Sequence, residues 1–182
     1  MTTATRTAAP ATRTAAGAAA TEARKRCFPP VCDQRTRLLV LGSLPGEIAL
    51  AKGQYYGNPQ NHFWRLIGAV IGRDLAPLDY EPRLAALREA GIGLWDTIAS
   101  AEREGALDAA IRGHAPNALP ELVGTLGSLR AIAFNGRTSA KIGRKALGET
   151  ALALVDLPSS SPAYTLPLDA KRAAWLQLRA FL

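Results

Sequence analysis

The sequence predicts an α/β domain: a three-layer α/β/α sandwich around a central, four-stranded, mostly parallel sheet. Two observations support this fold class. Short apolar runs typical of strands alternate four times with segments of helical periodicity, which is the order found when helices cover a parallel sheet. In addition, 182 residues of which 48% are hydrophobic suffice for one domain with a full core, but not for two large ones.

The expected strands are short apolar runs that end at glycine, proline or polar residues. The first run is apolar throughout and is followed by Gly42, which indicates a strand buried on both faces of a parallel sheet. The four strands are expected at Leu38–Leu41, Ile92–Trp95, Leu129–Phe134 and Ala151–Leu157.

The expected helices occupy the intervals after these strands. Phe63 belongs to a wide apolar face of the first helix, so we place it in the core, while Gly91 and Gly148 end the second and fourth helices. The five helices are expected at Asn61–Ile71, Arg83–Ala90, Ala118–Leu126, Thr138–Leu147 and Asp169–Leu182. The Gly- and Pro-rich stretch 43–59 is expected to be irregular.

Residues 1–26 are expected to form a disordered basic tail, and residues 27–182 the folded domain. The tail contains ten Ala and seven Thr but no Leu, Ile, Val or aromatic residue, so it cannot bury enough apolar surface to offset its ordering entropy. It carries +4 of the net charge of +7, which leaves +3 on the domain. A basic chain is compatible with a nucleic-acid partner. The tail also weakly resembles a mitochondrial transit sequence, but a solvated tail is the simpler interpretation.

The sequence lacks the motifs of several common sites. It contains no GxxxxGK[ST] phosphate loop, no GxGxxG after a strand and no GxSxG nucleophile turn. Cys27 and Cys32 form one close pair and His62 and His114 lie far from it in sequence, whereas a structural zinc site needs four ligands. No apolar run reaches the ~18–20 residues that span a bilayer. We therefore expect a cytoplasmic monomer with no metal, cofactor or membrane segment.

Function is expected at the carboxyl ends of the strands, because ligands bind there in parallel sheets. These ends carry Gly42–Gly46, Trp95–Asp96, Asn135–Gly136 and Pro158–Pro162. Amide, hydroxyl and tyrosine side chains of this kind can bind phosphate and a planar base without a metal.

The most informative segment is Gly42–Trp64, GSLPGEIALAKGQYYGNPQNHFW, which we call motif one. Its Gly-x-x-Pro-Gly turn lets backbone N–H groups approach a ligand closely. The ring of Tyr56 offers a face for stacking a base, and the amide of Asn58 or Asn61 can bind a water through its oxygen and a base through its nitrogen. Each residue also has a structural interpretation, since an asparagine can cap the following helix and a tyrosine can pack in the core.

Motif one resembles the first motif of the uracil-DNA glycosylase superfamily, most closely in its DNA-deoxyinosine, or hypoxanthine-DNA, glycosylase branch. Three more segments resemble the same family: LPSSSPA at Leu157–Ala163, which we call motif two, a Leu-Trp-Asp segment within Gly91–Ile111, and FNGRTSAK at Phe134–Lys141. The resemblance covers about residues 28–182. It implies a four-stranded parallel sheet between helices, and an enzyme that flips a damaged nucleotide out of DNA and hydrolyses its C1′–N bond.

The resemblance also implies a catalytic residue. Leu44 occupies the position where many superfamily members carry Asn or Asp to place the attacking water. The deoxyinosine branch also lacks a polar residue there, and the resemblance assigns the role to the segment that matches Asn61. We predict Asn61 as catalytic, with Asn58 as the other candidate; an amide is not basic near neutral pH, so its role is to orient the water. Mismatch-specific uracil glycosylases share this match, so it does not separate the two branches.

By the same matching, two further groups of residues are expected to touch DNA. Tyr56 would stack on the flipped base, and backbone N–H groups of residues 43–46 would meet the charge that develops on it. The base-binding group is Ser43, Leu44, Pro45, Gly46, Tyr56 and Asn58, and the phosphate-binding group is Asn135, Gly136, Ser159, Ser160 and Ser161. Ala163 or Tyr164 would lie near the gap in the base stack. No lysine is among these candidate site residues, and Lys52 is the nearest one, so we expect a monofunctional enzyme without a Schiff-base lyase step.

Three other functions stay open on the sequence. The first is a uracil or mismatch-specific glycosylase. The second is a DNA-binding protein of the same fold without catalysis, which Leu44 suggests. The third, hydrolysis of free nucleosides, is disfavoured because the serines of motif two would then have no flanking phosphates to contact.

Overall fold

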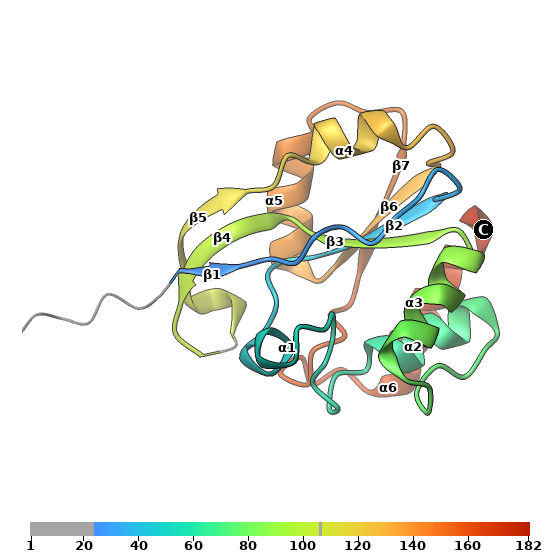
Figure 1. The fold of residues 1–182 in the computed structure, drawn as a ribbon, viewed down its shortest axis with the longest axis horizontal. Coiled ribbons are helices and arrows are strands. Elements are labelled where there is room, and N and C mark those ends of the chain that lie inside the picture. The colour runs from blue at the N-terminus through green and yellow to red at the C-terminus, as the bar shows by residue number, and fades with distance from the viewer. Residues whose placement is uncertain (1–23, 106) are drawn as a thin grey trace, which may run out of the picture.

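A four-stranded parallel sheet forms the centre of the computed structural model, which describes residues 24–105 and 107–182 (Figure 1). The strands follow the order β3-β2-β6-β7, and all three pairings are parallel. Their bounds are β2 Leu38–Gly42, β3 Ile92–Asp96, β6 Ala131–Asn135 and β7 Ala153–Leu157. The predicted central sheet is therefore confirmed, with boundaries that differ by one or two residues.

Helices cover both faces of this sheet, as the predicted three-layer sandwich requires (Figure 1). Leu38 and Val40 point to one helical layer, whereas Leu39 and Leu41 point to the other, because side chains alternate along a strand. The first layer contains α2 Phe63–Ile71, α3 Tyr80–Glu89, α6 Leu168–Trp175 and the 3-10 helix η2 Leu176–Phe181. The second contains α4 Leu119–Thr125 and α5 Arg137–Leu147. Phe63 is fully buried in the first layer, as predicted.

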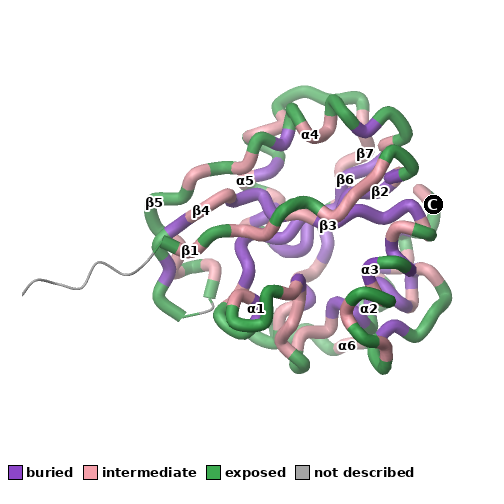
Figure 2. Tube along the Cα trace, viewed as in Figure 1, coloured by how far each residue is buried: buried purple, intermediate pink, exposed green. Residues whose placement is uncertain are grey.

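A second, antiparallel sheet was not expected from the sequence. It has the order β1-β4-β5, with bounds Lys25–Arg26, Ile98–Arg103 and Ile111–Pro116, and a short 3-10 helix η1 at Asp108–Ala110. Two register shifts interrupt the β4–β5 pairing, and β5 is largely exposed (Figure 2). These strands therefore lack both the continuous apolar run and the clean alternation by which a strand is recognised.

The expected boundary of the tail at residue 26 is also corrected. Arg24 donates to Ser100 Oγ at 3.0 Å, and β1 pairs with β4, so the described structure starts before residue 27. β4 supplies the backbone hydrogen bonds that hold β1 in place, and the composition of the tail does not show that such a partner strand exists. Residues 1–23, the rest of the predicted tail, lie outside the described residues.

Two local differences affect the candidate site. A short helix, α1 Glu47–Lys52, lies within the stretch expected to be irregular. The helix expected from Asn61 begins at Phe63, because Asn61 Oδ1 accepts the N–H of Phe63 at 3.0 Å and so turns the chain before the helix. In the described part of the chain, no helix is long and apolar enough to cross a membrane.

Candidate active site at the carboxyl ends of the strands

Gly42 is the last residue of β2 and the first residue of motif one, so motif one begins at the carboxyl edge of the sheet. It pairs in register with Asp96 at the end of β3. A Cβ atom at position 42 would lie 2.5 Å from Asp96 Oδ1 and 3.2 Å from Tyr56 Oη. Glycine is therefore required at this position, because the carboxyl of Asp96 and the hydroxyl of Tyr56 close in on the backbone.

Asp96 is a buried carboxyl group at the centre of this edge. Its side chain is 3% exposed, and Oδ2 has no hydrogen-bond partner among the described residues. Burial raises the pKa of Asp96 to about 7; the Asp108 carboxylate adds to this rise and the Arg103 guanidinium opposes it. A buried polar atom without a partner is costly, so Oδ2 is available to a ligand that brings a donor. The sequence indicated Asp96 only as a strand-end residue.

Tyr56 lies against Phe63 and reaches the end of β6. Its ring stacks on the Phe63 ring with centroids 3.7 Å apart and planes at 8°, which leaves at most one ring face for a base. Asn135 Nδ2 donates to Tyr56 Oη at 3.2 Å. Burial raises the pKa of Tyr56, so its hydroxyl stays protonated. The backbone of Tyr56 has φ +53°, a conformation that non-glycine residues rarely adopt.

Asn135 and Ser160 lock motif two onto β6. Asn135 Nδ2 donates to Ser160 Oγ at 2.8 Å, and the backbone N–H of Ser160 donates to Asn135 Oδ1 at 2.8 Å. Asn135 is 8% exposed and Ser160 1%. We therefore assign these two residues to holding the loop, in place of the direct phosphate contact expected from the sequence.

Gly136, Ser159 and Ser161 lie where motif two meets the end of β6. Gly136 has φ +99°, and its Cβ position lies 3.1 Å from Ser159 Cβ, so only glycine lets motif two approach. Ser159 Oγ accepts the N–H of Ser161, and Ser161 Oγ accepts the N–H of Ala163, both at 3.2 Å. Each hydroxyl proton is left to donate to a phosphate oxygen.

Lys171 supports motif two from α6, a contact that the sequence did not reveal. Its side chain is fully buried, and Nζ donates to the carbonyl oxygen of Ser161 at 3.0 Å. Trp175 Nε1 donates to Pro158 O at 3.0 Å. Burial lowers the pKa of Lys171. A long basic side chain near the C-terminus is ordinarily expected at the surface, so no local signal distinguished this lysine.

Arg103 from β4 holds the turn of motif one. This guanidinium is 1% exposed and donates to Leu44 O at 3.2 Å, to Gly105 O at 3.1 Å and to Pro45 O. Pro45 O and the Gly46 N–H belong to one trans peptide and point in opposite directions. Holding the carbonyl oxygen therefore fixes the direction of the Gly46 N–H.

The other two residues of the turn are held from the second sheet. Ser43 Oγ donates to Asp108 Oδ1 at 2.7 Å. The Leu44 side chain is buried with Ile98 and Ala101, so Leu44 can face a ligand only through its backbone. The second sheet thus acts as a support for motif one.

Asn58 and Asn61 line a cavity of about 340 Å³ together with Tyr56. Asn58 Oδ1 accepts the Gln60 N–H at 3.0 Å, as Asn61 Oδ1 accepts the Phe63 N–H. Each amide nitrogen is left to donate, and each oxygen keeps a second lone pair. The geometry brings both asparagines to one cavity and leaves the choice between them to experiment.

The remaining lining of this cavity contains unsatisfied donors. Trp64 Nε1 and Arg83 Nε are buried without a partner in the described structure, and both residues line the cavity. Arg83 lies 5.3 Å from the centre of the Trp64 ring. Within residues 24–105 and 107–182, no group of three or more His, Cys, Asp or Glu side chains is arranged to hold a metal ion.

Comparisons with known proteins agree with this architecture. The family model described as the uracil DNA glycosylase superfamily matches residues 29–179. A Methanosarcina barkeri protein named hypoxanthine DNA glycosylase is 40% identical over 157 residues, which cover 85% of this chain and 97% of that protein. A Methanosarcina acetivorans protein of the same name is 46% identical over 113 residues, 62% of this chain and 72% of that protein.

A solved structure is similar over nearly the same range. The solution NMR structure of a proposed uracil DNA glycosylase from Methanosarcina acetivorans has a TM-score of 0.77 and 38% identity, and the match covers 87% of this chain and 99% of that chain. The resemblance read from motifs one and two is therefore confirmed. On the match to residues 29–179 and these relatives, the chain belongs to the uracil DNA glycosylase superfamily.

Proposed function

We propose that the chain removes hypoxanthine, the deaminated form of adenine, from DNA by hydrolysing its N-glycosidic bond. The relative from Methanosarcina barkeri that carries the name of this activity aligns over 97% of its own length. Motifs one and two also meet at the end of β6, because Asn135 Nδ2 donates both to Tyr56 Oη and to Ser160 Oγ.

The buried carboxyl of Asp96 is the observation that carries the proposal. Its free Oδ2 can accept the N1–H of hypoxanthine, and the protonated form can also donate to O6. Adenine has no hydrogen on N1, so the ionised carboxylate would meet the N1 lone pair instead of a donor, whereas the protonated carboxyl could donate to that lone pair. Because the pKa of Asp96 is about 7, both forms are populated near neutral pH. It is the ionised form of Asp96 that favours the deaminated base over its parent.

Uracil is the second candidate substrate. It also presents an N–H beside a carbonyl oxygen, so Asp96 alone does not separate it from hypoxanthine. The Methanosarcina acetivorans structure, 38% identical, is described as a proposed uracil DNA glycosylase.

In the proposed reaction the C1′–N bond breaks, the base leaves with the electron pair, and the sugar becomes cationic. Asn61 orients the water that attacks C1′, and the Gly46 N–H, directed by Arg103, meets the negative charge that develops on the base. The free face of Tyr56 stacks on the flipped base, while Ser159, Ser161 and Gly136 contact flanking phosphates. The phosphates of the DNA stabilise the sugar cation.

We also propose that hydrolysis proceeds without a covalent Schiff base. Lys171 is the lysine that contacts motif two, but its ammonium is buried and donates to Ser161 O. Borohydride treatment of the reaction should therefore trap no enzyme–DNA adduct.

Cleavage of matched duplex oligonucleotides tests the function. Three duplexes, identical except for one inosine, uracil or adenine, are incubated with excess full-length chain, and strand scission after alkali is followed. Rapid cleavage at inosine and none at adenine is expected. Faster cleavage at uracil would support the second candidate, and binding to an abasic duplex without any cleavage would identify a non-catalytic member of the fold.

A further inference from the structure

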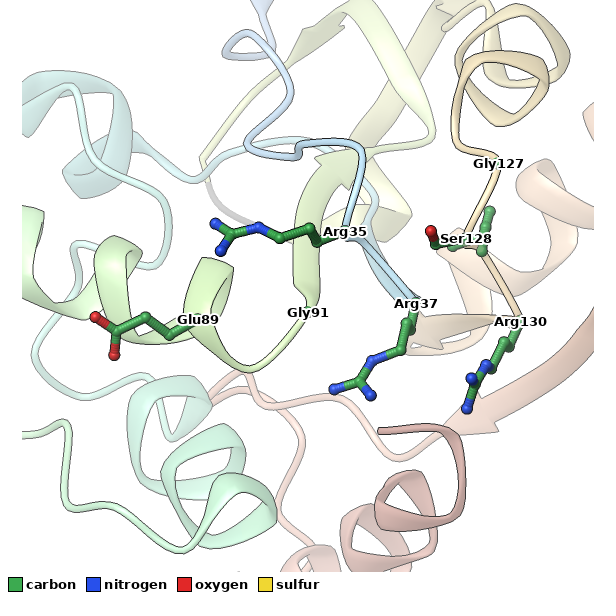
Figure 3. Close-up of a pocket in the computed structure, with 8 residues that line it drawn as sticks. Arg35, Arg37, Glu89, Gly91, Gly127, Ser128 and Arg130 are labelled. Atoms are coloured by element: carbon green, nitrogen blue, oxygen red, sulfur yellow. The ribbon is translucent and has the colours of Figure 1, made fainter.

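A second cavity, of about 630 Å³, lies at the opposite end of the parallel sheet (Figure 3). Its lining residues Arg37, Gly91 and Arg130 directly precede β2, β3 and β6. Since these strands have five residues each, the cavity is separated from the candidate active site by ~17 Å, at about 3.3 Å per residue. It is therefore not part of that site.

Three arginines give this cavity its charge. Arg35 and Arg37 come from the segment before β2, and Arg130 comes from the segment before β6. In Figure 3 the side chains of Arg37 and Arg130 run side by side and their guanidinium groups point the same way. Glu89 is the one carboxylate in the lining, and it is bound by Arg73 at 3.3 Å. The lining thus carries a net positive charge.

The three arginines differ in how many of their hydrogen-bond donors already contact other residues of the protein. Arg35 is paired with Asp33 at 2.9 Å. One nitrogen of Arg37 donates to Ala90 O at 3.2 Å, which fixes the side chain and leaves its other donors free. Arg130 is exposed and makes no ion pair or side-chain hydrogen bond within the described residues. Arg37 and Arg130 therefore have donors to give to an anion.

Neutral donors complete the lining. The turn at Gly127 and Ser128 joins α4 to β6, and Ser128 is exposed. For the Ser128 hydroxyl and for the amide N–H groups of Gly127 and Ser128, the described residues supply no hydrogen-bond partner. No heavy atom lies within 4 Å of the Cβ position of Gly127, so the turn is open. Guanidinium groups with hydroxyl and backbone donors are the set that proteins use for phosphate.

We propose that this cavity binds a phosphate group, as a site separate from the one that handles the base. Without an anion, the guanidinium groups of Arg37 and Arg130 share one cavity and repel; a phosphate would offset that repulsion and stabilise the folded chain by mass action. The phosphate can come from two sources: a free phosphate-bearing molecule, such as a nucleotide, or the backbone of a second DNA segment. The proposal does not depend on which base the enzyme removes.

The first arm of the test uses free phosphate. Pyrophosphate is titrated into the full-length chain by calorimetry, and the melting temperature is followed in parallel. Arg130→Gln and the double variant Arg37→Gln/Arg130→Gln are compared with Arg26→Gln, which removes the same charge from an exposed residue of β1. At least tenfold weaker binding is expected in the double variant, and a smaller loss in Arg130→Gln, which makes no contact whose removal would unfold the chain.

The second arm uses DNA. The chain is first saturated with an abasic-site duplex, and binding of a labelled, undamaged duplex to this complex is measured by anisotropy. Tenfold weaker binding in the arginine variants would identify DNA as the source, whereas pyrophosphate binding alone would identify a free ligand. Single-turnover cleavage of inosine DNA should stay within twofold of the parent. If Arg130→Gln and the double variant bind both probes as Arg26→Gln does, the proposal is wrong.

Discussion

Replacing Asn61 separates a catalytic role from a structural one, because the structure gives this residue a contact of its own. Asn61 Oδ1 accepts the Phe63 N–H at 3.0 Å where α2 begins. Loss of such a cap costs ~1 kcal/mol of stability. Loss of one positioned contact in the transition state costs ~3 kcal/mol, which corresponds to a ~100-fold lower rate.

The two costs appear in different measurements. The cap contributes to the free energy of unfolding, measured in urea, whereas the water contact contributes to the single-turnover rate on inosine DNA at saturating enzyme. Asn61→Ala should lose about 1 kcal/mol of stability and about two orders of magnitude in rate. Asn61→Asp keeps an oxygen for the Phe63 N–H, so its stability should stay near the parent, and any loss of rate in it cannot come from the cap.

Asn58 provides a matched control. Its Oδ1 makes the equivalent contact with the Gln60 N–H at 3.0 Å, and it lines the same cavity. Asn58→Ala should therefore reduce the rate less than tenfold. If Asn61→Ala is destabilised but cleaves at nearly the parental rate, Asn61 is only a cap; if Asn58→Ala shows the larger loss, the water belongs to Asn58.

Three further changes test the surroundings of the site. Tyr56→Ala should slow single-turnover cleavage by one to two orders of magnitude, since base–aromatic stacking contributes ~1–3 kcal/mol. Tyr56→Phe keeps the ring and loses only the contact from Asn135, so its loss of rate should be much smaller. Equal losses of rate in the two variants would exclude stacking. Burial raises the pKa of Asp96 from 3.8 to about 7, so between these pH values the folded chain holds a proton that the unfolded chain releases, and the free energy of unfolding should fall as the pH rises from 3.8 to about 7. Urea unfolding over this pH range should show a flatter dependence for Asp96→Asn than for the parent. If the slope is unchanged, Asp96 is not the titrating group. Arg103→Met leaves the carbonyls of Leu44, Pro45 and Gly105 without their donor, so the free energy of unfolding should fall by about 3 kcal/mol or more. The single-turnover rate should also fall, and Arg103→Lys should partly restore it. A Met variant as stable and active as the parent would show that the turn of motif one keeps its conformation without Arg103.

The apolar runs and the turn residues after them were sufficient to predict the central sheet and to locate the motifs. A strand buried on both faces of a parallel sheet has to be apolar at every position, and β2 has that composition. Turn residues followed each such run, so the ends of the strands and the polar residues on them could be located. Motifs one and two were specific enough to indicate the family, because several uncommon residues recur there in a fixed order.

The second sheet could not be predicted, because its strands lack the apolar run that identifies β2. β4 is buried without a regular alternation, β5 is largely exposed, and their pairing is interrupted, so no apolar run or alternation marks them. β1 lies in a segment whose composition is that of a tail. It pairs with β4, which lies more than 70 residues further along the sequence, so no pattern near β1 indicates the pairing.

The polar groups that are free to act could be identified only from the contacts in the folded chain. Asn135 and Ser160 looked like phosphate ligands in the sequence, yet they satisfy one another. Arg103 and Lys171 were not among the candidates from the sequence, yet both are buried and hold the backbone of a motif. Asp96 became a candidate only when its oxygen proved to have no partner beside Tyr56. Local patterns record whether a residue is polar, but hydrogen bonds between residues 10 to 59 positions apart decide whether its donors and acceptors are already used.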